Sequence, residues 1–338
     1  MAEDENRDKW EEFVEIGNTI QKMRGEFRIL EAIRAVETAK LLLRNGFFVN
    51  LPTKDRQLYK TLLPKIAVYL DGNTEMIQTA VDRYFLARHC KAGLDEKNFN
   101  ITFSTKNSGI QTGFTCDVDD GNQTTRFYIK THQYGPTDDN PKSREPPDAK
   151  ELFIYQILHR IGIGPEVHFI VPRHGTNMTI YIATKDCGLT LLSKLTRETA
   201  NTKALVQLDL ISRILCLRDC ATNSSNCGQV KDKPMIVDFR IDNQRGYVKP
   251  DLLEKFYQGN GEFNYLGWMR EAVGIPQEEK LRILKESVQA WNLLENIDIA
   301  MSEIEKLIQE IAATLRVNSD LDQYIRDIKE TIKILSQV

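Results

Sequence analysis

Two aspartates that each follow an apolar segment are the residues of this chain best suited to chemistry. Asp219 comes directly after Arg218, at the end of a predicted apolar helix that runs from Thr202 to about Leu217, and Asp238 follows Met235-Ile236-Val237. A carboxylate in such a position can orient or deprotonate a hydroxyl group, or bind a hard cation such as Mg²⁺. Each pattern alone also has an ordinary explanation. Asp219 can be a helix-terminal residue paired with Arg218, and Asp238 can cap the turn after a buried strand.

The segments upstream of these aspartates alternate between strands and helices. The β-branched and aromatic run Arg126-Phe127-Tyr128-Ile129-Lys130 predicts a short strand with Lys130 near its end. A predicted helix then runs from Asp148 to Leu158, and Gly162-Ile163-Gly164-Pro165 must end it because proline cannot continue a helix. Two strand-like runs follow, over 166–171 and 178–184. The predicted order is strand, helix, two strands, long helix, loop and strand.

This order, together with Lys130, Glu151, Asp219 and Asp238, resembles the protein-kinase-like superfamily over residues 98–270, which is roughly half of the chain. The Ile161-Gly162-Ile163-Gly164-Pro165 turn is closer to the choline kinase and aminoglycoside phosphotransferase branch. The resemblance implies an α+β fold with two lobes. Residues 96–187 would form a small lobe with an antiparallel sheet, residues 188–338 a mostly helical large lobe, and residues 1–95 an N-terminal helical extension.

The resemblance also implies a role for each charged residue, with ATP and Mg²⁺ as cofactors. Lys130 would hold the α- and β-phosphates, and Glu151 would pair with Lys130 and fix its position. Asp219 would engage the acceptor hydroxyl group, and Asp238 would coordinate Mg²⁺. For any one of these residues a solvent-facing or turn-capping role is the more common one, so the prediction depends on all of them occurring together in this order.

Glu151 has two competing interpretations. It shares one predicted helix face with the apolar residues Ile154, Tyr155 and Leu158, so it should point toward the core, where a carboxylate needs a cation. Lys130 is the nearest candidate in the order of the fold. In the alternative, Asp148-x-x-Glu151 is a capping box, with the glutamate folded back onto the start of its own helix.

The sequence departs from the protein-kinase pattern near the same residues. Leu217 stands where protein kinases have histidine, and Ser224 stands where the second metal ligand should be an asparagine. Asn226 can serve as that ligand only if the loop contains a two-residue insertion, and Asn223 also flanks the position. Arg240 replaces the glycine of the metal-binding motif. Small-molecule kinases tolerate this last change, since their motif requires only the aspartate.

A further departure concerns the hairpin that would cover a nucleotide. Alternating apolar residues predict one strand over 99–103 and its partner over 114–118. The loop between them contains Ser108 and Gly109, the candidate phosphate-binding residues, and only Gly113 in addition. Glycine-rich loops let backbone N–H groups approach phosphates closely, so this loop predicts weak phosphate binding.

Composition limits the remaining possibilities. The chain has 338 residues, 41% of them hydrophobic, which is long enough for two domains, and its net charge of −3 does not indicate nucleic-acid binding as its main role. It contains no apolar run of membrane-spanning length, and its first residues are acidic, unlike a signal peptide. The six cysteines lack Cys-x-x-Cys spacing and are expected to be reduced thiols. We therefore expect a cytoplasmic or nuclear protein without a membrane partner.

The two ends of the chain are predicted to be helical. Residues 1–95 contain three amphipathic stretches and no catalytic constellation, which favours a module that binds protein partners or forms a dimer. A module that only supports the small lobe is an equal alternative. Three apolar stripes that begin near Leu281, Ile304 and Leu321 predict C-terminal helices, and those up to about residue 300 are expected to belong to the large lobe.

Two classes of function remain. The first is an atypical ATP- and Mg²⁺-dependent phosphotransferase with weak or no turnover. The second is a catalytically inactive pseudokinase that acts as a protein-binding scaffold. Residues 240–275 contain no Ala-Pro-Glu ending of an activation segment, which weighs against a conventional protein kinase.

Overall fold

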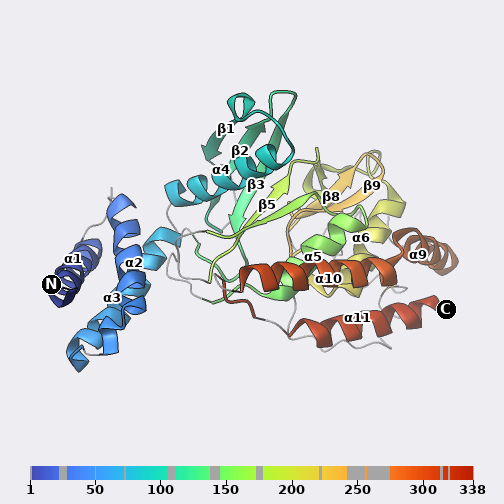
Figure 1. Cartoon of the computed structure of the whole chain (residues 1–338). Coiled ribbons are helices and arrows are strands. Elements are labelled where there is room, and N and C mark those ends of the chain that lie inside the picture. Colours follow the sequence, from blue (N-terminus) through green and yellow to red (C-terminus); the bar gives the residue numbers. More distant parts are fainter. Residues whose placement is uncertain are drawn as a thin grey trace.

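The structure is a computed structural model that describes residues 2–22, 29–49, 51–71, 74–105, 111–137, 145–172, 178–220, 223–241, 256, 275–312, 315–318 and 320–337. Its described part combines a five-stranded antiparallel sheet with many helices (Figure 1), which confirms the predicted α+β class. None of the helices in the described part of the chain is both long and apolar enough to cross a membrane.

The five-stranded sheet positions Lys130. Its order is β1-β2-β3-β5-β4, and every neighbouring pair is antiparallel. The strands are β1 (Asn100–Thr105), β2 (Gly113–Asp119), β3 (Thr124–Thr131), β4 (Val167–Ile170) and β5 (Tyr181–Lys185). Side chains alternate between the two faces of a strand, so Phe127 and Ile129 of β3 are buried on one face while Tyr128 and Lys130 lie on the other. Gly113 allows β2 to approach β3 closely, because a Cβ atom there would lie 2.0 Å from the Ile129 carbonyl oxygen.

Helices cover both faces of this sheet. Helix α4 (Thr74–Lys91) packs Ile77, Val81 and Phe85 against the face that carries Phe127 and Ile129, and it crosses the sheet in Figure 1. Helix α5 (Ala149–Arg160) packs in one core with Ile182 of β5. The side chain of Ile182 lies on the face of the sheet opposite to the side chains that contact α4. Helix α4 therefore belongs to the apolar core of the sheet, although the sequence grouped it with the N-terminal helices.

The remaining N-terminal helices form a bundle of their own. Helices α1 (Ala2–Lys22), α2 (Ile29–Arg44) and α3 (Thr53–Asp71) lie together at one end of the molecule in Figure 1 and share an apolar core. The first of the three amphipathic stretches expected in residues 1–95 is divided between α1 and α2, and residues 23–28 lie outside the described residues. Met76, in the first turn of α4, also packs into this core.

The C-terminal part is mostly helical, with short strands that hold the two aspartates. Helix α6 (Thr202–Ile214) ends before Leu217, because Cys216 has a left-handed backbone with φ 49°. Leu217–Arg218 is instead strand β7, paired with β10 (Arg240–Ile241), so the prediction that this helix extends to Leu217 was wrong. The other elements are β6 (Thr190–Leu191), β8 (Cys227–Val230), β9 (Lys233–Ile236), α9 (Gln277–Trp291), α10 (Leu293–Ile311), α11 (Leu321–Ser336) and the 3-10 turns η1 (Phe47–Val49), η2 (Glu96–Asn98) and η3 (Leu192–Lys194).

A buried histidine connects α4 to the sheet. His168 Nδ1 lies 3.2 Å from the Tyr84 hydroxyl oxygen of α4, and His168 Nε2 lies 3.2 Å from a carboxylate oxygen of Glu166. Burial, with a smaller repulsion from Arg88, lowers the pKa of His168 to about 4. The folded protein therefore holds this imidazole neutral at pH values where the unfolded chain protonates it.

We predict that His168→Phe makes the protein less sensitive to acid. The native stabilisation from the neutral imidazole is complete above the unfolded pKa of about 6.5 and declines as the pH falls towards 4, because the unfolded chain binds the proton more tightly. Between pH 6.5 and pH 5 the loss of folding stability from one such histidine amounts to roughly 2 kcal/mol. Urea unfolding of both proteins at pH 7 and pH 5 measures the difference. An equal loss of stability in both would contradict the prediction.

Candidate active site

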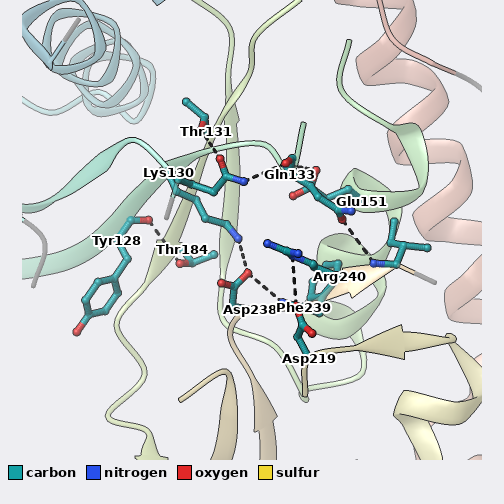
Figure 2. Close-up of polar contacts among 12 residues, drawn as sticks. Tyr128, Lys130, Thr131, Gln133, Glu151, Thr184, Asp219, Asp238, Phe239 and Arg240 are labelled. Atoms are coloured by element: carbon teal, nitrogen blue, oxygen red, sulfur yellow. Dashed lines mark hydrogen bonds and ion pairs between the residues drawn. The ribbon is translucent and has the colours of Figure 1, made fainter. Parts of the chain in front are cut away.

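An ion pair between Lys130 and Asp238 lies at the centre of the candidate site (Figure 2). The Lys130 ammonium donates to Asp238 Oδ1, although the two residues are 108 positions apart in the sequence. The ammonium also lies 5.4 Å from the centre of the buried Tyr155 ring. Burial alone would lower the pKa of Lys130, but the attraction of Asp238, Tyr155 and Glu151 outweighs it and raises this pKa. Lys130 therefore remains a fixed positive charge.

Asp238 is held in place by the backbone on both sides of it. Val237 N and Asp238 N donate to the carbonyl oxygen of Asn226 at 2.9 and 3.1 Å, and Phe239 N donates to Asp238 Oδ1 at 2.9 Å. Phe239 itself is buried, with its ring centre 4.6 Å from that of Tyr155. Asp238 Oδ2 has no protein partner among the described residues, since the contacts of this carboxylate fall on Oδ1. The loop thus brings Asn226 beside an available carboxylate oxygen.

Glu151 points into the core, but the expected contact with Lys130 is not formed. Its side chain is 1% exposed and accepts a hydrogen bond of 2.9 Å from Gln133 N, while the ion pair of Lys130 is with Asp238. The capping box is not formed either: Asp148 caps the helix through Lys150 N, but the Glu151 carboxylate bonds to Gln133 N and does not fold back to Asp148 N. Burial raises the pKa of Glu151 to about 7, and the nearby Lys130 and the Gln133 hydrogen bond only partly oppose this.

Asp219 is paired with an arginine whose role the sequence did not suggest. Its backbone is left-handed, with φ 66°, a conformation that aspartate tolerates better than most residues. Its carboxylate oxygen Oδ2 lies 3.3 Å from Arg240 Nε (Figure 2). Arg240 points out of the core because it alternates with the buried Phe239 and Ile241 along β10. The residue predicted to engage a hydroxyl group therefore already has a cationic partner.

Apart from the buried Glu151, these charged residues line one cleft of about 970 Å³, a volume typical of ligand pockets. Lys130, Asp219, Asn223, Asn226 and Asp238 lie on its wall, so the structure brings these candidates together. Ser108 and Gly109 lie outside the described residues. The sequence did not predict a role in the cleft for several other polar residues, and only their polarity next to buried segments could have indicated one. They come from the segment after β3, the end of β5 and the residue after it, η3 and β10: Gln133, Lys185, Asp186, Lys194 and Arg240.

The residues of the cleft fit a Mg²⁺ ion with modest protein ligation. Asp238 Oδ2 has no protein partner in the described part of the chain, and the Asn226 side chain lines the same cleft. One carboxylate and one amide oxygen, completed by water and phosphate oxygens, form a donor set that Mg²⁺ accepts. The described residues contain no group of three or more histidine, cysteine, aspartate or glutamate side chains placed to hold a metal ion. A tightly held structural metal is therefore not expected from them.

The sequence matches no known protein-family profile and no curated protein. The geometry of the cleft is accordingly the basis for assigning a function.

We predict that Glu151→Gln stabilises the protein at alkaline pH and leaves it unchanged in acid. The raised pKa of about 7 means that the folded state holds a proton that the unfolded chain releases near 4.5, so the stability is complete below pH 4.5 and declines as the pH rises through 7. Glutamine keeps an acceptor for Gln133 N and has no charge to bury. The gain at pH 8 should reach up to about 3 kcal/mol.

Denaturant unfolding at pH 5 and pH 8 tests this, with Glu151→Ala as the control. Alanine leaves the Gln133 N–H without an acceptor and should destabilise the protein at both pH values by roughly 2 to 4 kcal/mol. A glutamine variant that is less stable than the native chain at pH 8 would show that Glu151 is ionised and stabilising there.

Proposed function

We propose that this protein is kinase-like, with a cleft that binds ATP and Mg²⁺ weakly and turns it over slowly or not at all. The observation that carries the proposal is the convergence of Lys130, Asp219 and Asp238 on one cleft, from a strand and two separate loops. Phosphoryl transfer needs little from a protein beyond positioning and charge, and these three residues supply a cation for phosphate and two carboxylates of different surroundings.

The arrangement of elements supports a two-lobed kinase-like fold. The antiparallel sheet would be the small lobe, with α5 against it and Lys130 on the strand that faces the cleft. The helices α6, α9, α10 and α11 would belong to the large lobe. The segment that carries Asp219 follows α6, and β9, which precedes Asp238, places Ile236 in the same apolar core as α6. The cleft is lined from both parts, as a nucleotide site between lobes requires.

In this proposal each residue has a defined task. Mg²⁺, held by Asp238 and Asn226, would supply the positive charge that offsets the phosphates. Lys130, released from Asp238, would donate hydrogen bonds to phosphate oxygens. Asp219 would accept the proton of an acceptor hydroxyl group while the oxygen of that group bonds to the γ-phosphorus and the β–γ bridging bond breaks, which yields ADP.

Two contacts support weak turnover. Glu151 bonds to Gln133 N and not to Lys130, so no carboxylate fixes the lysine in a phosphate-binding position. Asp219 is paired with Arg240, so its carboxylate must give up this partner before it can accept a proton from a hydroxyl group. Misplacement of a reacting group by about 1 Å can slow a reaction on the order of a hundredfold, and both contacts act on alignment.

The second candidate function is an inactive scaffold that binds protein partners in the cytoplasm or nucleus. It is favoured by the N-terminal bundle, which exposes large apolar side chains near the end of α2 and in η1, with Leu43 59% and Val49 77% exposed. Apolar side chains grouped on a surface often mark sites of protein association. This function needs neither ATP nor Mg²⁺.

A thermal-stability scan with ATP separates the two functions. We predict a Mg²⁺-dependent rise in melting temperature that is lost in Lys130→Ala and in Asp238→Asn, because each removes a charge that holds the nucleotide or its metal. At an ATP concentration a hundredfold above Kd the stabilisation is about 2.7 kcal/mol. Any ATP consumption should disappear in Asp219→Asn.

Lys203→Ala is the matched control, since Lys203 is also paired with a carboxylate, that of Glu286, but lies on α6 outside the residues that line the cleft. Its melting temperature should respond to ATP as the native chain does. The absence of any shift in the native chain would reject the nucleotide site and leave the scaffold.

A further inference from the structure

Arg240 is anchored so that its side chain must face the cleft. The buried Phe239 and Ile241 hold the backbone on both sides of it, and strand β10 pairs Arg240 with Arg218 of β7. Ile241 N also donates to Gln133 Oε1 at 3.5 Å, which ties this short strand to the segment after β3. A surface arginine usually has a mobile side chain, but the backbone of Arg240 is held by these contacts where it lines the cleft.

The contact with Asp219 occupies only part of the guanidinium group. The ion pair runs through Nε, at 3.3 Å from Asp219 Oδ2, and the Arg240 side chain is 54% exposed. A guanidinium group is planar and carries N–H donors on more than one edge, so a carboxylate beside Nε leaves the two terminal nitrogens for a second anion. No described residue accepts a hydrogen bond from these terminal nitrogens. Figure 2 shows the guanidinium group in the space between Asp219, Asp238 and Lys130.

Lys194 supplies a second cation to the same cleft. It is the last residue of η3, and Ser193 N donates to the Ser224 carbonyl oxygen at 3.2 Å, which fixes this turn against the loop that follows Asp219. Lys194 lines the cleft, is exposed, and has no ion-pair partner among the described residues. Lys130 and Lys185, by contrast, are paired with Asp238 and Glu166. The cleft therefore has cationic donors that are not used by these two ion pairs, namely the terminal nitrogens of Arg240 and the ammonium group of Lys194.

We propose that the second ligand of this cleft is an anionic hydroxy compound, whose carboxylate or phosphate group is held by Arg240 and Lys194 while its hydroxyl group reaches Asp219. The acceptor role of the hydroxyl group rests on the proposed function, but the anion site does not depend on ATP. Arg240 recognises the ligand through the two terminal nitrogens of its fork, and Asp219 orients that fork through Nε. A neutral alcohol accepts only weaker hydrogen bonds from these donors and a cationic alcohol is repelled by them, so the charge of the ligand determines specificity.

Calorimetric titration of the full chain with glycerol 3-phosphate, glycerate and glycerol tests the proposal without nucleotide. We expect both anions to bind at least tenfold more tightly than glycerol. Arg240→Gln should weaken the binding of both anions by roughly tenfold to a hundredfold, since it removes charge-assisted hydrogen bonds, and Lys194→Gln by a smaller factor. Arg240→Lys should restore only part of the affinity, because lysine keeps the charge but not the fork.

Two controls locate the anion. Arg282→Gln changes an arginine of similar exposure, 58%, that is paired with Glu286 on α9 outside the cleft, and it should leave all affinities unchanged. Lys203→Gln changes a lysine of α6 outside the cleft and should also leave all affinities unchanged. Anions that bind no better than glycerol, or whose binding is lost in Lys130→Ala and kept in Arg240→Gln, would overturn the proposal. An ATP response without selective anion binding would reject only this inference. Selective anion binding without an ATP response would reject only the nucleotide site.

Discussion

The ion pair between Lys130 and Asp238 joins two parts of the chain that are 108 positions apart, and much of the fold serves to keep its partners together. A partly buried charge that loses its partner is strongly destabilising, so the strand and the loop must hold their positions jointly. On one side, α4 supports the face of the sheet opposite Lys130. On the other, the Asn226 carbonyl group and the packing of Phe239 on Tyr155 fix the backbone around Asp238.

The cleft without ligand largely neutralises its own charges. Asp238 is matched by Lys130, Asp219 by Arg240, and Lys185 by Glu166. A ligand that binds at Lys130 and Asp238 must exchange partners with these two groups, so its affinity is the difference between new and old contacts and not the sum of the new ones. Ionic strength should affect such an exchange less than it affects the attraction of a ligand to unpaired charges, because charges are redistributed and not simply brought together.

The sequence predicted local structure better than it predicted partners. Alternation identified β1 and β2, and a run of β-branched and aromatic residues identified β3. Helical spacing correctly predicted that Glu151 points toward the core. The same spacing could not identify the hydrogen-bond partner of Glu151. That partner, Gln133 N, lies in an irregular segment after β3, and the conformation of such a segment cannot be predicted from a periodic pattern. The early end of α6 depends on a left-handed Cys216, which apolar periodicity does not reveal. The pairing of Asp219 with Arg240 depends on β7 and β10, two-residue strands too short to leave a pattern.

Helix α4 belongs to two apolar cores at once. Met76 packs with the N-terminal bundle, whereas the adjacent Ile77 packs with the sheet, together with Val81 and Phe85. A chain shortened to begin at residue 96 would therefore uncover Phe127, Ile129 and their neighbours over a whole face of a twisted sheet. Such a fragment would expose a large apolar surface and would be prone to aggregate through that face. A fragment that begins before Thr74 keeps α4 packed on the sheet. The smallest stably folded fragment that contains the cleft must therefore include this helix.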